Sequence, residues 1–149
     1  MMNSENELSR RFTIISSDFG RAGQVSTNIK ELLQEIGIDS KIIRRAAIAT
    51  YEAEMNVVMY AEKAELFLSI NPDLINIRIR DKGQGIKNID LAMQEGFSTA
   101  TDKMRELGFG AGMGLPNIKR NADEFDISSI PGKGTTVNII FHLNQSGNQ

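Results

Sequence analysis

Two glycine-containing segments hold the residues whose types and spacing suggest chemistry. Asp81 ends a predicted strand and is followed by Gly83 and Gly85, while a second glycine cluster at 108–114 precedes a predicted helix. A buried carboxylate can accept a hydrogen bond from an exocyclic amine such as that of adenine. Glycine lets the backbone approach a ligand closely and adopt positive φ, and helix N-termini favour phosphate. Together the two segments predict a site for a purine nucleotide.

A second pair of polar residues lies on a predicted helix. Glu52 and Asn56 are four residues apart, so they share one face of that helix. An amide oxygen suits Mg²⁺, which prefers oxygen ligands, and a carboxylate could orient or deprotonate a nucleophile. Taken alone, the pair is weak evidence for a site and fits an ordinary exposed helix face better, because helices routinely expose Glu and Asn.

Composition limits the classes of protein to consider. The 149 residues suit one domain with a hydrophobic core, and the net charge of -2 without a dense Lys/Arg run argues against nucleic-acid binding. The absence of cysteine excludes disulfides, thiolate catalysis and zinc–thiolate sites. The polar, acidic N-terminus lacks the pattern of a signal peptide, and no apolar run has the length of a membrane span. We therefore expect a cytoplasmic protein with no membrane segment.

Hydrophobic periodicity and turn residues predict the elements that position these side chains. Residues 1–10 and 144–149 are expected to be flexible, which leaves one domain at 11–143. Residues 95–113 are rich in Gly, Ser and Thr and weakly periodic, which is typical of a functional loop. The expected elements are a strand at 11–16, a helix capped by Ser17 or Asp18 and ended by Gly37, a helix from Asp39 to about Ala61, strands at 65–71 and 74–81, a short helix at 89–94, a helix at 115–121, and a hairpin of strands at 124–129 and 135–142.

The order of these motifs resembles the GHKL ATPase superfamily, which includes gyrase, Hsp90, histidine kinases and MutL. The ordered set is Glu-x-x-x-Asn at 52–56, Asp-x-Gly-x-Gly at 81–85, a loose segment, Gly-x-Gly at 110–112, and Gly-Thr-Thr at 134–136. Within this superfamily the chain is similar to the small bacterial serine/threonine kinases of the anti-sigma regulatory group, and most of all to their switch kinases. The segments that carry this similarity are 81–86, 95–99 and 110–116.

The resemblance implies a fold, cofactors and residue roles. The fold would be an α/β two-layer sandwich of the Bergerat, or histidine kinase-like ATPase, type, with a mixed, mainly antiparallel sheet and helices on one face. The implied cofactors are ATP and Mg²⁺. By position, Asp81 would accept the adenine amino group, Gly83 and Gly85 would lie under the base, and Thr135 would support Asp81 through ordered water. Asn56 would be the Mg²⁺ ligand and Glu52 the general base. The phosphates would be bound by the backbone of Gly110, Gly112 and Gly114, with 95–113 as an ATP lid and Arg105 near the γ-phosphate.

The implied activity is that of a protein serine/threonine kinase acting on a STAS-domain regulator. Many anti-sigma kinases carry a His-Gly pair after the asparagine. This chain has Tyr60 and Ala61 at those positions, as the switch kinases do. Its lid is longer than the lid of the switch kinases. Two alternatives stay open: an ATP-dependent binding module that sequesters a sigma factor or another regulator, and slow ATP hydrolysis that drives lid closure and formation of a homodimer. The presence of Glu52 favours catalysis, because nucleotide binding alone needs no base.

Overall fold

A computed structural model of the chain describes residues 7–16, 19–83, 85–86, 89–93 and 114–143. Within them, no helix combines the length and the apolar character needed to cross a membrane. The elements are β1 (Leu8–Ile15), a 3-10 turn (Phe19–Arg21), α1 (Gln24–Glu35), α2 (Ser40–Tyr60), β2 (Ala61–Ile70), β3 (Leu74–Gly83), α3 (Ile89–Ala92), α5 (Gly114–Asn121), β4 (Glu124–Ile130) and β5 (Gly134–His142).

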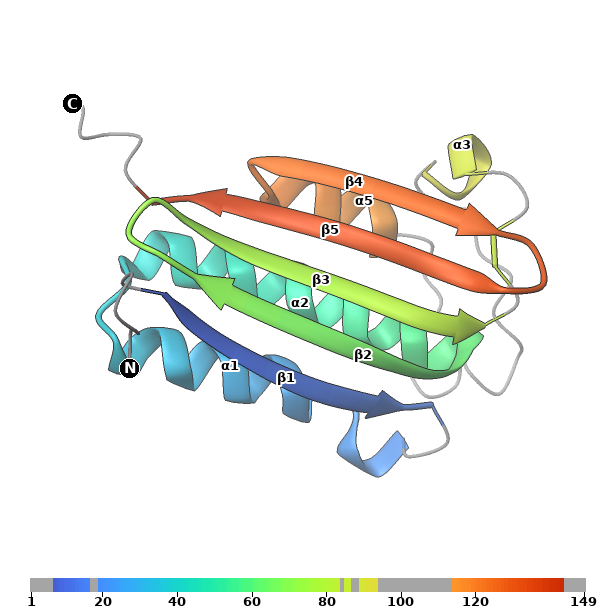
Figure 1. Ribbon diagram of the computed structural model, residues 1–149, viewed down its shortest axis with the longest axis horizontal. Coiled ribbons are helices and arrows are strands. Elements are labelled where there is room, and N and C mark those ends of the chain that lie inside the picture. Colours follow the sequence, from blue (N-terminus) through green and yellow to red (C-terminus); the bar gives the residue numbers. More distant parts are fainter. Residues whose placement is uncertain (1–6, 17–18, 84, 87–88, 94–113, 144–149) are drawn as a thin grey trace.

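The strands form one sheet in the order β1-β2-β3-β5-β4. The helices α1, α2 and α5 lie on one side of it, behind the strands in Figure 1, and none of the described helices forms a layer on the other side. This arrangement confirms the predicted two-layer sandwich. The sheet was expected to be mixed and mainly antiparallel, and all four pairings among the described strands are antiparallel.

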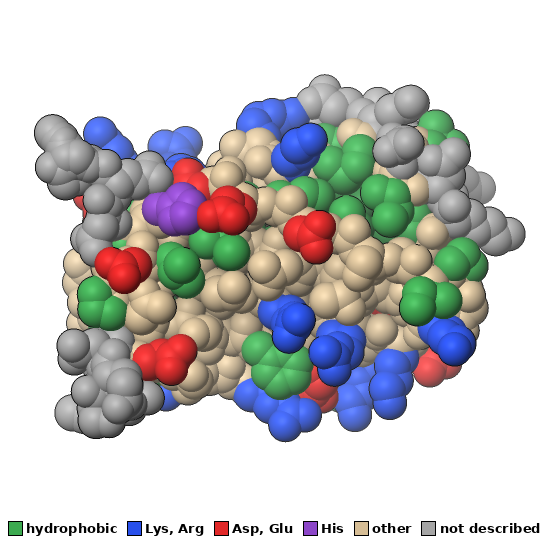
Figure 2. All heavy atoms as spheres, turned by 45° about the horizontal axis from the view of Figure 1, so that its top comes forward, with side chains coloured by type: hydrophobic (Ala, Val, Ile, Leu, Met, Phe, Trp, Pro, Cys, Tyr) green, Lys and Arg blue, Asp and Glu red, His purple; other side chains and the backbone are tan. Residues whose placement is uncertain are grey.

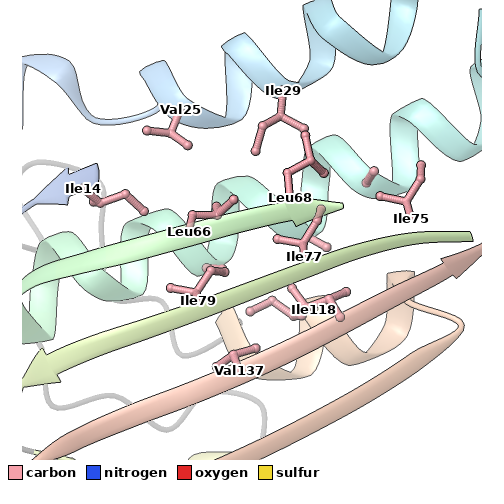
Figure 3. Packing of buried hydrophobic residues seen from close by; sticks show 14 of the residues in the cluster. Ile14, Val25, Ile29, Leu66, Leu68, Ile75, Ile77, Ile79, Ile118 and Val137 are labelled. Atoms are coloured by element: carbon pink, nitrogen blue, oxygen red, sulfur yellow. The ribbon is translucent and has the colours of Figure 1, made fainter. Parts of the chain in front are cut away.

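The core fills the space between the sheet and the helices. On β3, Ile75, Ile77 and Ile79 are buried and alternate with polar residues, which is the period of a strand with one face inward. From the helical layer, Ile29 and Ile118 meet this face and are fully buried (Figure 3). Burying an aliphatic side chain of this size contributes about 1.5–3 kcal/mol, so these contacts hold the two layers together.

Local sequence signals predicted several element boundaries correctly. Asp39 caps α2 by accepting a hydrogen bond from the Lys41 N–H at 3.1 Å. Gly37, with φ 83°, follows α1. Between β2 and β3, the Asn71 side chain accepts hydrogen bonds from the N–H groups of Asp73 and Leu74.

Three predicted starts were wrong. The second strand begins at Ala61 rather than at residue 65, directly after α2. The first strand begins at Leu8 rather than at residue 11, because Leu8 pairs with Ile70 and is only 2% exposed. The first helix begins at Gln24, with Gly23 in the left-handed conformation as its N-cap, and not at a cap on Ser17 or Asp18. The helix begins there because the carboxylate of Glu54, from another helix, accepts hydrogen bonds from the N–H groups of Gly23 and Ser26.

Candidate active site

Asp81 lies near the end of β3, on the side of the sheet that the helices cover. Its Oδ1 accepts hydrogen bonds from the backbone N–H groups of Gly83 at 3.0 Å and Thr135 at 3.1 Å. Within the described part of the chain, Oδ2 accepts none. The carboxylate is thus fixed through one oxygen and presents the other to a ligand. Burial raises the pKa of Asp81, and the two backbone donors act against that rise.

The glycines around Asp81 are required by close packing of the protein on itself. A Cβ on Gly83 would lie 3.0 Å from the carbonyl oxygen of Tyr60, at the end of α2. Gly85 has φ 78°, and its Cβ would lie 2.5 Å from the Ile130 carbonyl oxygen. Gly134, the first residue of the predicted Gly-Thr-Thr motif, was given no role from the sequence; it has φ 145°, and its Cβ would overlap the Asp81 carbonyl. These contacts bring the end of α2 and the β4–β5 turn against the Asp81 strand.

Thr135 and Ser129 form a hydroxyl pair beside Asp81. Thr135 is 8% exposed, and its Oγ1 lies 2.8 Å from Ser129 Oγ. Ser129 Oγ also accepts a hydrogen bond from the Ile86 N–H at 2.7 Å, so it ties the segment after Gly85 to β4. Sequence reasoning missed Ser129. The signal was present, because the predicted hairpin places Ser129 directly opposite Thr135.

The second predicted pair, Glu52 and Asn56, lies on α2 and faces α5. A Cβ on Gly114, the first residue of α5, would lie 3.2 Å from Asn56 Oδ1, so the helix start and this amide are in contact range. Within the described residues the Asn56 side chain makes no hydrogen bond, which leaves its oxygen available for a ligand. Glu52 Oε2 accepts a hydrogen bond from Asn117 Nδ2 of α5 at 3.1 Å.

Asn117 is a further site residue that the motif pattern did not reveal. Its Oδ1 accepts a hydrogen bond from Arg120 Nη1 at 2.7 Å, which orients the amide so that its nitrogen points at Glu52. A hydrogen bond to a carboxylate stabilises the charged form. Helical spacing between Gly114 and Asn117 was the available signal, since residues three apart share a helix face.

The two predicted groups lie at the same end of the molecule. Gly83, two residues after Asp81, packs against Tyr60 at the end of α2, one helical turn beyond Asn56. Together with Gly114 and Thr135, these residues are the part of the predicted site that the structure brings together. The predicted lid at 95–113, with Arg105, Gly110 and Gly112, lies outside the described residues.

Comparison with known proteins identifies the family. Residues 41–145, more than half of the chain, match the model of the histidine kinase-, DNA gyrase B- and HSP90-like ATPases. The chain belongs to this ATPase family. The resemblance to GHKL ATPases drawn from the ordered motifs is therefore confirmed.

Relatives of known type lie in the anti-sigma regulatory group. The chain is 32% identical over 127 residues to the serine/threonine-protein kinase RsbT of Bacillus subtilis, covering 83% of this chain and 87% of that protein. It is 30% identical over 143 residues to the anti-sigma F factor of Anoxybacillus flavithermus, covering 96% and 88%. The GHKL member described here is thus similar along most of its length to both kinds of regulator.

Solved structures share the fold. The RsbU and RsbW domains of a Mycobacterium tuberculosis protein match with a TM-score of 0.59 at 17% identity, covering 90% of this chain and 32% of that longer chain. The mycobacterial sensor histidine kinase MprB matches with a TM-score of 0.54 at 13% identity, covering 91% of this chain and 97% of that chain. At these identities the likeness establishes the shared architecture alone.

Proposed function

We propose that this GHKL ATPase is a protein serine/threonine kinase of the anti-sigma switch type, which transfers phosphate from ATP to a STAS-domain regulator. The observation that carries the proposal is the position of Glu52. It lies one turn from the Asn56 amide, which no described residue bonds, and it is oriented by Asn117 from the neighbouring helix. A carboxylate fixed beside a candidate ligand for Mg²⁺ suits proton removal from an acceptor hydroxyl.

The nucleotide fits the residues around Asp81. Asp81 Oδ2, which has no partner among the described residues, is an acceptor of the kind that the adenine amino group needs, and GTP presents a carbonyl oxygen at the corresponding position. Thr135 Oγ1 and Ser129 Oγ add hydroxyl groups beside the carboxylate that could hold an ordered water. A carboxylate and two hydroxyls therefore support selective binding of the adenine base.

The phosphates fit the end of the site near Asn56 and Gly114. The N-terminus of α5 offers backbone N–H groups and the positive end of a helix dipole. Among the described residues there is no cluster of three or more Asp, Glu or His side chains suited to a metal. Mg²⁺ would therefore be held by the Asn56 oxygen together with phosphate oxygens and water, where it neutralises phosphate charge.

Glu52 would act as the general base. Its carboxylate would accept the proton of the serine or threonine hydroxyl as that oxygen bonds to the γ-phosphorus of ATP, whose bond to the ADP leaving group breaks. The Asn117 hydrogen bond holds Oε2, which leaves Oε1 for the acceptor proton. Phosphoryl transfer relies mainly on positioning and electrostatic stabilisation, and this pair of helices provides both.

Two substitutions on α2 test the kinase proposal. We expect Glu52→Ala to retain ATP affinity and to lose about 10²–10⁴-fold in the rate of phosphoryl transfer. Asn56→Ala should lose the Mg²⁺-dependent part of ATP binding. The measurements are calorimetry for ATP and transfer of labelled phosphate to STAS-domain proteins of the same genome. Glu31→Ala, an exposed carboxylate on α1, is the matched control. Full transfer activity in Glu52→Ala would assign that residue a structural role.

A second candidate is ATP-dependent sequestration of a sigma factor without essential kinase activity. The similarity to an anti-sigma F factor along 96% of the chain favours it. The same labelled-ATP experiment separates the two candidates. Tight ATP-dependent binding of a sigma factor, with no phosphate transfer to any STAS-domain protein, would support sequestration and contradict the kinase.

A further inference from the structure

The open side of the sheet, which no described helix covers, carries a group of positive side chains. The strand register places Arg11 of β1 opposite Phe67 of β2, and Phe67 opposite Arg78 of β3. Figure 2 shows Lys and Arg gathered on one part of this side, with acidic side chains among them, and further Asp and Glu on another part. We call the positive group the basic face, which consists of Arg11, Lys63, Phe67, Arg78, Arg80 and Lys82.

Most of this charge is not neutralised within the protein. Arg11 pairs with Glu65 at 3.0 Å and lies over the Phe67 ring at 5.3 Å. Glu65 is the one acidic residue that the register places opposite a cation of the basic face, Arg80, and it also attracts Lys63, so one negative charge stands against five positive ones. In the described part of the chain, the other four cations, Lys63, Arg78, Arg80 and Lys82, form no ion pair. The whole chain has a net charge of -2, so the basic face is opposite in sign to the molecule that carries it.

Protection of a sheet edge does not explain these cations. Lysine and arginine on edge strands prevent unwanted strand pairing, but β3 is the central strand, between β2 and β5. Arg78, Arg80 and Lys82 occupy successive outward positions on it and are all exposed. Like charges on neighbouring positions of one sheet face repel each other. A ligand that brings carboxylates to this face would remove that repulsion.

We propose that the basic face docks an acidic segment of a protein partner, on the opposite side of the sheet from the nucleotide site. Side chains alternate along a strand, so Arg80 and Lys82 point to the opposite side of the sheet from Asp81. Partner and nucleotide can therefore be bound together. Arginine and aromatic side chains dominate the energetics of protein interfaces, and Phe67 lies between two arginines.

The other half of the same side favours a protein over a nucleic acid. Glu124 and Asp126 of β4 are exposed on it and carry negative charge. Glu124 contacts His142 Nε2 at 2.7 Å. A uniform polyanion lying across the sheet would meet these carboxylates, whereas a protein can present acidic side chains only where the cations are. The carboxylates of Glu124 and Asp126 thus fix the orientation in which the partner docks.

The test uses a poly-glutamate peptide as the probe and a poly-glutamine peptide of equal length as its control. The variant Arg78→Gln/Arg80→Gln removes two charges from the basic face. Lys30→Gln/Lys41→Gln removes two exposed charges from the helical layer and is the matched control. We expect poly-glutamate affinity to fall about tenfold in the basic-face variant and less than about twofold in the control. ATP affinity should be unchanged in both variants, and ATP should not change the affinity for the peptide.

Several results would overturn the proposal. The first is an equal loss of poly-glutamate affinity in the two double variants. The second is equal affinity of the parent for poly-glutamate and poly-glutamine. The third is tighter binding of a single-stranded oligonucleotide than of poly-glutamate at the same salt concentration. A parent protein that sediments as a dimer and a basic-face variant that sediments as a monomer would assign the face to self-association instead. Circular dichroism of each variant confirms that the comparison is made between folded proteins.

Discussion

Asp81 is a carboxylate whose charged form the fold disfavours. Burial raises its pKa above the ordinary 3.8, and the N–H groups of Thr135 and Gly83 offset this only in part. A carboxyl group whose pKa is raised on folding adds stability at low pH, and this stability is lost as the pH rises through the folded pKa. At neutral pH the ionised side chain therefore weakens the free protein. Such a residue suits binding better than it suits stability.

Asp81→Asn should separate these two effects. The Asn oxygen would keep the Gly83 and Thr135 N–H bonds at the Oδ1 position, so its NH₂ group would face the adenine amino group. Two donors then oppose each other, and we expect ATP binding to weaken by about 1–3 kcal/mol, with a smaller preference over GTP. In urea titrations the free variant should match or exceed the parent at neutral pH, and any advantage should disappear below about pH 3.8.

The control for this prediction is Asp126→Asn, an exposed β4 residue that removes the same charge. It should leave ATP affinity unchanged. Equal ATP affinity in Asp81→Asn and the parent, measured by calorimetry, would contradict the assignment of Asp81 to the base.

At the scale of helices, the start of α1 depends on a residue of α2. Glu54 is 2% exposed, and its two oxygens accept hydrogen bonds from the N–H groups of Gly23 at 3.0 Å, Val25 at 3.3 Å and Ser26 at 2.9 Å. The free N–H groups of a helix start and its positive dipole both favour a carboxylate there. Glu54 thus fixes the angle and position of α1 against α2.

Removing this charge should loosen the helix start. We expect Glu54→Gln to lower the free energy of unfolding by about 1–3 kcal/mol, because one carbonyl oxygen replaces two charged acceptors for three N–H groups. Amide hydrogen exchange at Val25 and Ser26 should become faster. Glu31→Gln, which is exposed on α1, should leave both measurements near the parent values. Unchanged exchange at these amides in Glu54→Gln would contradict the capping role.

Elements defined by neighbouring residues could be predicted from the sequence, and contacts between distant residues could not. Asp39 and Asn71 were predictable because each bonds to backbone within three residues. The start of α1 was not, because its acceptor, Glu54, comes from another helix. In the site, the motifs supplied the positions of Asp81 and Asn56. Ser129 and Asn117 were missed, and Gly134 was placed in a motif without a role, because their contacts depend on strand register and helix packing.

At the scale of the whole molecule, Asp123 connects the two layers. One oxygen accepts a hydrogen bond from Arg45 Nη2 of α2 at 2.7 Å, and the other accepts from the His142 N–H of β5 at 2.8 Å. Burial acts to raise the pKa of Asp123, but the His142 donor and the Arg45 guanidinium outweigh it and hold the pKa below its usual value. A lowered pKa means stability that is present above the ordinary value and lost as the pH falls through the folded one.

Asp123→Asn should therefore destabilise the protein at neutral pH, and the difference from the parent should shrink as the pH falls below about 3.8. Urea titrations across this range measure it. Asp81→Asn is predicted to show the opposite sign at neutral pH, with its change above about pH 3.8 rather than below it, so the two variants check each other. A constant difference for Asp123→Asn at every pH would mean that its contribution does not come from ionisation.

The hydrogen bond from the Thr135 N–H to Asp81 joins residues 54 apart in the chain. A proposed nucleotide pocket built on this contact exists only after the last hairpin has joined the central strand, so partly folded chains would lack it. ATP would then act as a selective ligand of the native state. At a concentration 100 times its Kd, such a ligand raises the free energy of unfolding by about 2.7 kcal/mol. Under the proposed function, the cell's ATP supply would thus influence how long the protein survives as well as what it does.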